Sequence, residues 1–507
     1  MEWSIVSSVL LAIVITTTIS ILSRRRKSLG HGPKLPPGPP GWPIIGNLFD
    51  LGSMPHRSLA DLRPKYGEVV WLKLGAINTM AVLSSRAAAE LFRHHDLSFA
   101  TRALTETSRA HDYHLSSVAL APYGAYWRVM RRLMTTEMFV GRRVGETAPL
   151  RRRCVDQMLT WIEEEKAEAA AVHVARFVFL MTFNLLGNVM LSRDLVDPNS
   201  EDGSEFFRAM NGLMEWSGHV NLADLFPWLS RVDPQGLMRK MERDMGKAIE
   251  IGSKFVRERM NEKKEESTNE KTKDLLDVLL EFEGSGKDEP SKLSERQMNI
   301  FILEVFFAGT ETVSSSIEYA MTELLLNPDA MAKAKAKAEL SQVVGSGLKL
   351  EEADIDKLPY LQAVVKESLR LHPPIPLLVP RKATNDTVFM GYFVPKNTQV
   401  FVNAWAIGRD PEVWNDASSF KPERFLDSNL DYRGQNYEYI PFGAGRRICA
   451  GLPLAQCLLH FVLGSLIHHF DWRLDEKVSR ETMDMRDRMG IVARKLEPLF
   501  AVPTKGL

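Results

Sequence analysis

A cysteine in a glycine-rich segment carries the clearest chemical signature of this chain. Cys449 lies near the end of the run FGAGRRICAG, which starts at Phe442. Gly443 and Gly445 let the backbone turn sharply and approach a flat ligand closely. An apolar helix is expected from about Leu452, and a cysteine just before a helix is favoured as a thiolate by the helix dipole and the backbone N–H groups. The segment predicts a thiolate ligand, with a buried structural cysteine as the alternative.

An acid and a hydroxyl stand side by side within a long apolar stretch. Residues 308–312 read AGTET, so Glu311 directly precedes Thr312. Glycine is costly inside a helix and an acid is costly in a core, and such local conflicts are expected at functional sites. An adjacent acid and hydroxyl can relay protons to a reacting group. The alternative is that Thr312 only bonds back to its own helix.

Two further pairs of residues have helical spacing. Glu367 and Arg370 lie three residues apart and share one face of a helix predicted over 360–371, which is otherwise apolar. Trp127 and Arg131 lie four residues apart and also share a face. Arginine is well suited to binding carboxylates. For either pair taken alone, an ordinary surface contact is the alternative.

The elements that must position these residues are mainly helices. Ser294 and Gln297 form an S-x-x-Q capping box that predicts the start of a helix, and Pro328 predicts its end at Asn327. About 33 residues at 1.5 Å each make a helix of roughly 50 Å, which is long enough to cross a whole domain. Two short strands are predicted, at Val69–Leu74 and at Thr79–Val82.

The N-terminus differs from the rest of the chain. Ser4–Leu22 contains no charged residue, and at 1.5 Å per residue it reaches about 28 Å, enough to span a bilayer core. A basic cluster follows at 24–27, whereas a cleavable signal would place its positive charge before the apolar stretch. The positive-inside rule therefore predicts a cytosolic body. Three regions are expected: an N-terminal membrane anchor at 1–23, a basic stop and Pro-rich hinge at 24–46, and a catalytic domain at 47–507.

Composition excludes several classes of protein. The chain has 507 residues, and Lys+Arg and Asp+Glu are both 64, so it lacks the basic excess of a nucleic-acid binder. Its three cysteines supply neither a disulfide framework nor a CxxC zinc pattern, which favours a reducing compartment for the body. No phosphate-binding loop of the form GxxxxGK[ST] occurs. The remaining chemistry centres on the cysteine segment.

That segment resembles the F-x-x-G-x-R-x-C-x-G signature of the cytochrome P-450 superfamily, with Phe442, Gly445, Arg447, Cys449 and Gly451 at the fixed positions. The uncharged N-terminus, the Pro-rich segment and the long helix are similar to the same family, so the resemblance covers essentially the whole chain. It implies a mainly α fold with small β-sheets, the cytochrome P-450 fold, in which a long central helix crosses over the haem, plus an N-terminal transmembrane helix.

The resemblance also assigns roles to the residues above. Cys449 is expected to be the axial ligand of the iron of haem b. Glu311 is expected to supply protons and Thr312 to support bound oxygen, although Val313 stands where the family often has a second hydroxyl. Further residues are expected to bind the haem and its propionates: Trp127, Arg131, Arg381, Phe442 and Arg447. The loop that presents the cysteine is expected to be held by Glu367, Arg370 and Arg424.

The substrate pocket is expected from the same resemblance. Its predicted lining is Phe301, Glu304, Val305, Ala308, Ile375, Val379 and Ile491. All but one of these residues are apolar, which favours a small hydrophobic substrate. Glu304 lies four residues before Ala308 and so on the same helical face. Its carboxylate is expected to bond to the protein, and pairing with an amine substrate is the alternative.

The expected activity is that of an NADPH-reductase-dependent haem-thiolate monooxygenase that inserts one oxygen atom from O2 into a small hydrophobic plant metabolite. The sequence is most similar to the plant microsomal group of geraniol and iridoid oxidases, which implies a monoterpenoid or iridoid substrate. The expected partners are NADPH–cytochrome P-450 reductase, substrate, O2 and membrane lipid, with no nucleic acid. The expected location is the endoplasmic reticulum membrane, single-pass, with the body facing the cytosol.

Three alternatives stay open at the level of sequence. A flavonoid or alkaloid hydroxylase would share most of these segments. A haem-thiolate isomerase or dehydratase could dispense with the Glu311–Thr312 pair. A non-catalytic haem-binding membrane protein would need no reductase. Dependence of product formation on both NADPH and dioxygen separates these classes from the monooxygenase.

Overall fold

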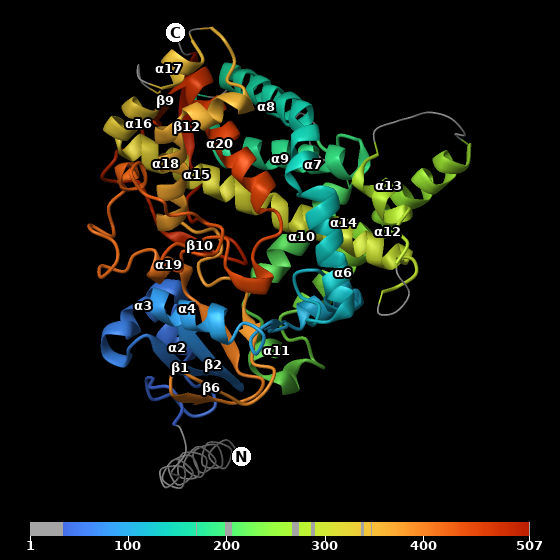
Figure 1. Ribbon diagram of the computed structural model, residues 1–507, viewed down its shortest axis with the longest axis vertical. Helices are drawn as coiled ribbons and strands as arrows, with labels where there is room; N and C mark the ends of the chain where they lie inside the picture. Colours follow the sequence, from blue (N-terminus) through green and yellow to red (C-terminus); the bar gives the residue numbers. More distant parts are fainter. Residues whose placement is uncertain are drawn as a thin grey trace, which may run out of the picture.

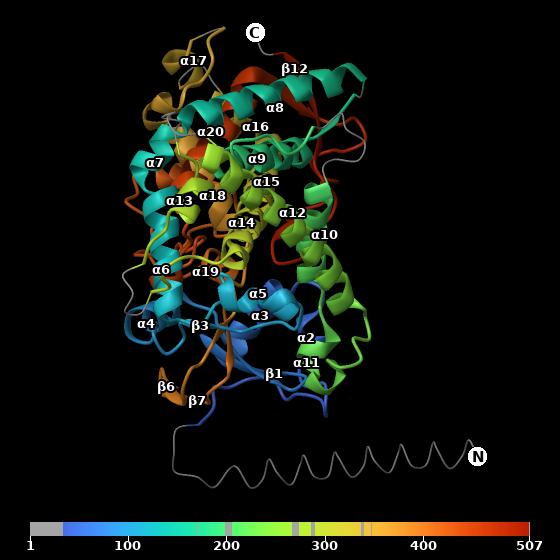
Figure 2. The ribbon, with the colours of Figure 1, turned by 90° about the vertical axis from the view of Figure 1, so that its right-hand side faces the viewer.

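The computed structural model describes residues 34–168, 170–197, 205–265, 273–284, 289–335, 339–345 and 347–505. The predicted membrane anchor at 1–23 and the basic cluster at 24–27 lie outside these residues. Within the described chain, helices predominate and the sheets are small, as predicted. Figures 1 and 2 show the larger sheet, with α2 and α3, at one end of the molecule and α8, α17 and α20 at the other.

The helices are α2 (Leu48–Leu51), α3 (Pro55–Tyr66), α4 (Ser85–His94), α5 (Tyr113–Ser116), α6 (Ala125–Leu133), α7 (Gly141–Glu146), α8 (Ala148–Glu168), α9 (Val174–Leu191), α10 (Glu205–Gly218), α11 (Leu222–Leu225), α12 (Leu237–Glu265), α13 (Leu275–Leu280), α14 (Glu295–Gly309), α15 (Glu311–Leu326), α16 (Pro328–Lys335), α17 (Leu340–Val343), α18 (Pro359–Leu371), α19 (Ala404–Ile407) and α20 (Leu452–His469). Short 3-10 turns include η2 (Thr107–Asp112), η4 (Pro227–Leu229), η5 (Glu352–Lys357), η6 (Pro422–Phe425) and η7 (Gly445–Arg447), and η3 (Met134–Met138) is a π-helical turn.

The strands are β1 (Val69–Leu74), β2 (Ile77–Val82), β3 (Thr101–Arg102), β4 (Val172–His173), β5 (Arg381–Lys382), β6 (Thr387–Phe389), β7 (Tyr392–Val394), β8 (Gln399–Val402), β9 (Phe470–Leu474), β10 (Asp487–Met489), β11 (Ala493–Lys495) and β12 (Phe500–Lys505). The largest sheet has the order β1-β2-β8-β5-β3, in which only β2 and β8 pair in parallel. It brings β3 and β5, which are far apart in sequence, to one edge beside the cysteine segment. A three-stranded sheet, β4-β12-β9, and the pairs β6-β7 and β10-β11 complete the β-structure.

The predicted central helix runs through the middle of the molecule as α14 and α15 (Figures 1 and 2). It begins with the predicted capping box, in which the Ser294 and Gln297 side chains each accept the other's backbone N–H. The predicted single helix is interrupted at Thr310. There the Thr310 and Thr312 hydroxyls donate to the carbonyls of Phe306 and Ala308, both at 2.8 Å. Such side-chain bonds compete with the helical ladder, and the backbone bond from the Thr310 N–H to the Phe306 carbonyl is long, at 3.3 Å.

Close helix packing explains the glycine in the middle of the central helix. A Cβ atom placed on Gly309 would lie 2.9 Å from Cδ1 of Leu186 on α9. A larger residue would have to shift the end of that leucine side chain. The glycine noted in the sequence therefore lies where α9 packs closely against the central helix.

Three helices of the described chain are long and apolar enough to cross a membrane by length and composition: α9, the combined α14 and α15, and α20. Between 67% and 78% of the apolar window of each is buried inside the protein. They supply much of the main hydrophobic core. Their apolar character is therefore explained by burial in the core.

The Pro-rich segment packs onto the sheet from its first described residue. The Lys34 carbonyl accepts from the Phe393 N–H of β7, and the Pro37 carbonyl accepts from the Trp71 N–H of β1. A Cβ atom on Gly38 would overlap the Trp71 carbonyl, so the contact is close. The part of the predicted hinge from Lys34 onward is therefore hydrogen-bonded to the body. The side chains of Trp42, Ile44 and Phe49 that follow are exposed.

Candidate active site

The cysteine segment forms a tight loop before α20. The Cys449 N–H donates to the Phe442 carbonyl at 3.0 Å. Gly443 and Gly445 have φ angles of 72° and 69°, in the left-handed region that favours glycine. At Gly445 a side chain would also approach the carboxylate of Asp96 to 2.6 Å. Both glycines predicted to shape the loop are therefore required by its geometry.

Cys449 faces a space inside the protein. Its side chain is exposed, although desolvation by the surrounding protein raises the pKa of its thiol. An exposed side chain with protein on most sides indicates that the sulfur borders a space enclosed largely by the protein. The backbone N–H groups of Gly451 and Leu452 and the charge of Arg131 act in the opposite direction and lower this pKa. The expected stabilisation of the thiolate by the helix start is present, but burial outweighs it in the protein alone.

The central helix also exposes one position in its middle. Ala308 is exposed and Thr312 half-buried, whereas Phe301, Val305 and Phe306 one or two turns earlier are buried. The Thr312 hydroxyl donates to the Ala308 carbonyl, which is the alternative that the sequence left open. This turn therefore presents a small side chain and a hydroxyl to an open space.

Glu311 is paired with an arginine of the C-terminal part of the chain. Its carboxylate lies 2.9 Å from the Arg494 guanidinium of β11, which is 43% exposed. Burial raises the pKa of Glu311, while Arg494 and Arg488 lower it. A buried acid with a raised pKa that also reaches a partly exposed cation can hold and exchange a proton.

Buried arginines gather beside the cysteine loop. Arg447 donates to the carbonyls of Ala100 at 3.0 Å and Ala121 at 2.6 Å. Arg381 donates to Asp96 at 3.0 Å and to the Ala444 carbonyl at 3.1 Å. Burial lowers the pKa of both guanidinium groups. At Arg447 the charge of Arg381 adds to the effect of burial, and the pKa falls to about 10.

Two more arginines complete this cluster. Arg102 of β3, which no sequence motif marked, donates to the Val379 carbonyl at 2.6 Å. Burial lowers its pKa strongly, and the charges of Arg381, Arg447 and Arg131 lower it further. The Arg131 guanidinium has neither a hydrogen bond nor an ion pair with another side chain among the residues that the structure describes. Asp96 is the only carboxylate bonded to any of the four arginines within that part of the chain.

The positive charge of these four arginines exceeds the negative charge bonded to them, and this surplus fits a haem. A haem carries two carboxylates, which would compensate cations that otherwise repel each other. The cysteine that borders an internal space stands beside the same cluster, since Arg131 and Cys449 influence each other's pKa. A soft sulfur ligand next to a site for a dianion fits haem in both respects.

Trp127 supports this cluster from α6. Its indole N–H donates to the Val118 carbonyl at 2.8 Å, and its ring lies 4.3 Å from the Arg447 guanidinium. It shares α6 with Arg131, as the helical spacing predicted. In this structure Trp127 stacks on one arginine of the cluster, and its indole N–H is already occupied by the chain.

The predicted supporting triad comes together on α18 and η6. Arg370 donates to both oxygens of Glu367, at 2.7 and 2.8 Å, and Arg424 donates to the same carboxylate at 3.0 Å. Glu367 and Arg370 are fully buried. Arg370 also donates to the carbonyls of Gly408 and Ala417, so its charge is fully hydrogen-bonded.

The triad is connected to the cysteine loop through an aromatic residue. Tyr439, shortly before Phe442, donates its hydroxyl to the Lys366 carbonyl of α18 at 2.8 Å. Its ring packs against Trp414, and the Arg370 guanidinium lies 5.1 Å from the same Trp414 ring. The helix that carries the triad therefore holds the chain that leads into the loop.

The predicted pocket residues fall into different surroundings. Phe301, Glu304 and Val305 are buried, Ile375 and Val379 are half-buried, and Ala308 and Ile491 are exposed. The Glu304 carboxylate is occupied by three donors from Ser117, Val118 and Ala119. Because these donors satisfy it, Glu304 bonds to the protein as expected and has no free oxygen for an amine.

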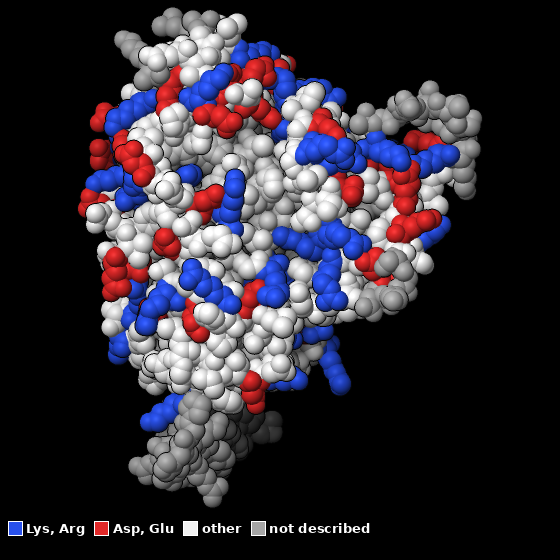
Figure 3. All heavy atoms as spheres, in the orientation of Figure 1, with Lys and Arg blue, Asp and Glu red and all other residues white. Residues whose placement is uncertain are grey.

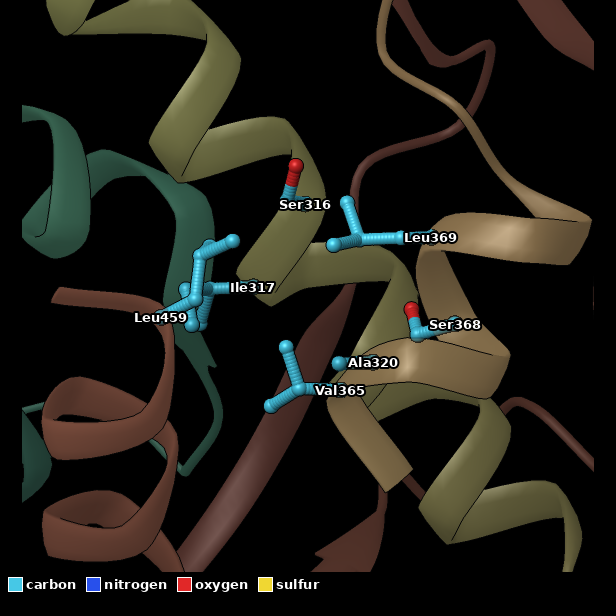
Figure 4. Close-up of a pocket in the computed structure, with 7 residues that line it drawn as sticks. All are labelled: Ser316, Ile317, Ala320, Val365, Ser368, Leu369 and Leu459. Atoms are coloured by element: carbon cyan, nitrogen blue, oxygen red, sulfur yellow. The ribbon is translucent and has the colours of Figure 1, made fainter. Parts of the chain in front are cut away.

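A small cavity lies beyond the central turn, between α15, α18 and α20 (Figure 4). Its lining is Ser316, Ile317, Ala320, Val365, Ser368, Leu369 and Leu459. The Ser316 hydroxyl donates to the Thr312 carbonyl at 2.8 Å. The space is close to the size of one water molecule and cannot hold a substrate. It lies between the helix that carries Thr312 and the helix that carries the triad.

Comparison with known proteins identifies the family of the chain. The cytochrome P-450 family model matches residues 36–500. The chain is 54% identical over 508 residues to cytochrome P-450 76A2 of Solanum melongena, with 100% of both chains covered. It is 51% identical to iridoid oxidase of Catharanthus roseus, over 94% of this chain and 93% of that one. It is 42% identical to geraniol 8-hydroxylase of Swertia mussotii, over 98% and 97%.

The fold matches as well. A solved zebra fish cytochrome P-450 with progesterone superposes with a TM-score of 0.75 at 25% identity, over 89% of this chain and 99% of that one. The family match confirms the predicted resemblance, the enzyme class, and the haem cofactor with electrons from NADPH through a reductase. The chain therefore belongs to the cytochrome P-450 family of haem-thiolate monooxygenases.

Proposed function

We propose that this enzyme inserts one oxygen atom from dioxygen into a small, neutral, hydrophobic plant terpenoid, and that Cys449 is its haem ligand. The observation that carries the site assignment is the exposed sulfur of Cys449 beside the buried Arg102, Arg381 and Arg447 and the half-buried Arg131. The terpenoid substrate is supported by similarity to iridoid oxidase and geraniol 8-hydroxylase.

The roles of the chain's own residues follow from their surroundings. Bound haem would supply the activation of dioxygen that the family uses. Cys449 would hold it through sulfur, and Arg131, Arg381 and Arg447 would bind its carboxylates. Phe442 and Trp127 would pack beside it. The supporting triad, Glu367, Arg370 and Arg424, would keep the cysteine loop in place.

Proton supply would rest on the central turn. Glu311 is buried with a raised pKa, so it holds a proton more readily than an exposed acid, and Arg494 leads from it toward solvent. Thr312 would offer its hydroxyl to oxygen by releasing the Ala308 carbonyl. The helix is interrupted at Thr310. A change of the hydrogen-bond partner of the Thr312 hydroxyl would therefore affect only the helical bonds next to this point.

The neutral substrate follows from the apolar predicted pocket and from Glu304. An alkaloid hydroxylase would need an anion for its amine, and the Glu304 oxygens are already bonded to the chain. Burial of apolar surface, at about 25 cal/mol per Å², would therefore provide most of the binding free energy. We expect oxidation at an allylic or primary carbon.

The ligand assignment is tested by Cys449→Ala. The reduced carbon-monoxide complex of the wild-type enzyme should show the red-shifted Soret band of a thiolate-bound haem, and the variant should lose it. Cys154→Ala and Cys457→Ala are matched controls that should keep the band, because neither cysteine belongs to the loop. Retention of the band in Cys449→Ala would exclude this ligand.

The reaction class and the substrate are tested together. A panel of terpenoids, phenolics and alkaloids is incubated with the enzyme, a plant reductase, NADPH and dioxygen. Turnover should be highest for small terpenoid alcohols and should stop without NADPH or without dioxygen. Turnover that needs neither would favour an isomerase or dehydratase. Preferred turnover of flavonoids or alkaloids would replace the terpenoid assignment.

The redox partner would be NADPH–cytochrome P-450 reductase, and we propose that it approaches the face near the cysteine loop. Figure 3 shows Lys and Arg spheres on this face in the region where Figure 1 places α6. Arg128 and Arg132 of α6 and Arg446 of the loop are exposed there. An exposed basic surface near the cofactor attracts an acidic partner and accelerates its association. We also propose a location on the endoplasmic reticulum membrane, anchored by residues 1–23.

A further inference from the structure

The carboxylate of Glu304 organises a loop. One oxygen accepts from the Ser117 hydroxyl at 2.8 Å and from the Ala119 N–H at 2.5 Å, and the other accepts from the Val118 N–H at 2.5 Å. The Leu120 N–H donates to the Ser117 oxygen at 3.0 Å and closes the turn. Glu304 is 3% exposed, so these donors replace the water that the carboxylate has lost.

The carbonyl groups of the same loop point to cations. The Val118 carbonyl accepts from Arg447 at 3.1 Å and from the Trp127 indole at 2.8 Å. The Ala119 carbonyl accepts from Arg102 at 3.3 Å, and the Ala121 carbonyl accepts from Arg447 at 2.6 Å. The loop 117–121 therefore lies with its N–H groups toward one buried anion and its carbonyls toward two buried cations.

This arrangement connects the central helix to the cysteine loop. Glu304 lies on α14, one turn before the exposed Ala308, and Arg447 lies two residues before Cys449. Peptide groups ordered by a buried carboxylate present fixed carbonyl dipoles to the guanidinium groups behind them. A change at Glu304 must therefore be transmitted to Arg447 through the loop.

We propose that Glu304 is a positioning residue: through the loop 117–121 it fixes Arg447 and Arg102, and so sets how tightly the enzyme holds its haem. The proposal rests on the proposed function, in which Arg447 binds a haem carboxylate, and Arg102 belongs to the same cluster of arginines. Glu304 acts on the cofactor and does not recognise the charge of a substrate.

Glu304→Gln is the sharpest change. A carboxylate offers acceptors to all three donors, whereas an amide has one oxygen and places an NH2 group against at least one N–H or O–H. Either a peptide group of the loop 117–121 must then rotate, or one of the three hydrogen bonds to residue 304 is lost. In both cases the carbonyl groups of the loop change position. Ser117→Ala is a milder change in the same contact, because it removes only the hydroxyl. Glu318→Gln is the matched control: Glu318 is an equally buried acid on α15 that accepts a backbone N–H from Leu499, outside this loop.

The experiment measures the rate of haem transfer from each purified holoenzyme to excess apomyoglobin, together with the thermal unfolding of each protein. Glu304→Gln should raise the transfer rate about tenfold or more, the ratio expected when a buried charged hydrogen bond is lost. Ser117→Ala should raise it by about threefold, and Glu318→Gln should change it less than twofold. The double variant should transfer haem no faster than Glu304→Gln alone, since both changes act through one loop.

Two results would overturn the proposal. One is an unchanged transfer rate in Glu304→Gln, and selective loss of amine binding in that case would make Glu304 a substrate contact. The other is an equal increase in Glu318→Gln, which would indicate general destabilisation. If Glu304→Gln does not fold, Ser117→Ala alone decides between the first outcome and the expected one. Failure of the proposed function would look different: the wild-type enzyme itself would lack a thiolate-bound haem.

Discussion

At the scale of single residues, Thr310 and Thr312 allow a controlled comparison. Each hydroxyl donates to the carbonyl four residues earlier at 2.8 Å, but Thr310 is fully buried beside Met214 and Thr312 is half-buried. If Thr312 delivers protons, Thr312→Ala should keep the haem and the substrate but should divert most NADPH consumption to peroxide. The measurement is the ratio of product to NADPH consumed.

Thr310→Ala is the control for this prediction. It removes the same group with the same helical bond, so it should keep the wild-type ratio. Similar ratios in both variants would show that the helix conformation, and not the Thr312 hydroxyl, matters for coupling.

The residues around Cys449 show what local sequence can reveal. The loop glycines, the Glu367–Arg370 pair and the Trp127–Arg131 spacing are local patterns, and the structure brings each into the expected arrangement. Arg102 and Asp96 were missed, because Arg102 joins the arginine cluster only through the pairing of β3 with β5 and Asp96 only through its bond from Arg381, which is distant in sequence. In a sequence, a charged residue outside any motif cannot be distinguished from an ordinary surface residue. Only the tertiary structure shows that these two residues belong to the cluster.

At the scale of elements, Asp487 of β10 joins three parts of the chain. Its carboxylate accepts from Tyr319 of α15 at 2.5 Å and from Arg57 of α3 at 2.7 Å, and it lies 3.1 Å from the ring of His56. Burial raises the pKa of Asp487, but the bonds from His56 and Tyr319 and the charge of Arg57 lower it well below its ordinary value.

Asp487→Asn should therefore lower the free energy of unfolding by about 3 kcal/mol at pH 7, because it leaves buried partners unpaired. A carboxyl whose pKa is depressed in the folded state stabilises the protein above its unfolded pKa of about 4, and this contribution is lost as the pH falls toward the folded pKa. The difference between wild type and variant should thus be constant from pH 7 to pH 5 and should shrink below about pH 4.

Urea unfolding followed by circular dichroism gives this difference. Asp484→Asn is the control, because Asp484 is paired mainly with the exposed Arg486 and such pairs contribute little. A difference that grows toward low pH would contradict the role assigned to Asp487.

Element boundaries show where sequence reasoning stops. The strand Val69–Leu74 and the capping box at Ser294 were predicted as observed, since both depend on adjacent residues. The break at Thr310 was not predicted as a helix end, because side-chain bonds to backbone carbonyls depend on the rotamers of two threonines. The Pro-rich segment was predicted as a hinge, and its contacts with β1 and β7 could not be predicted, because these strands are distant from it in sequence.

At the scale of the whole molecule, the location of the body remains a prediction from the uncharged span and the basic cluster that follows it. Added protease should digest the body in intact microsomes, because the positive-inside rule leaves everything after residue 27 in the cytosol. Immunoblotting against the C-terminus measures this. A lumenal protein that resists the protease in the same microsomes is the control, and equal resistance of the enzyme would reverse the orientation.

The Pro-rich segment also has a mechanical consequence. Because Lys34 is already hydrogen-bonded to β7, an anchor ending at Leu22 would be joined to the body by about 12 residues. Even fully extended, such a tether reaches only about 40 Å. The enzyme would therefore be held to the membrane by the end that carries its larger sheet, with α8 and α20 at the opposite end, and its rotation would be restricted. Encounters with a partner on that membrane become a two-dimensional search between molecules of restricted orientation.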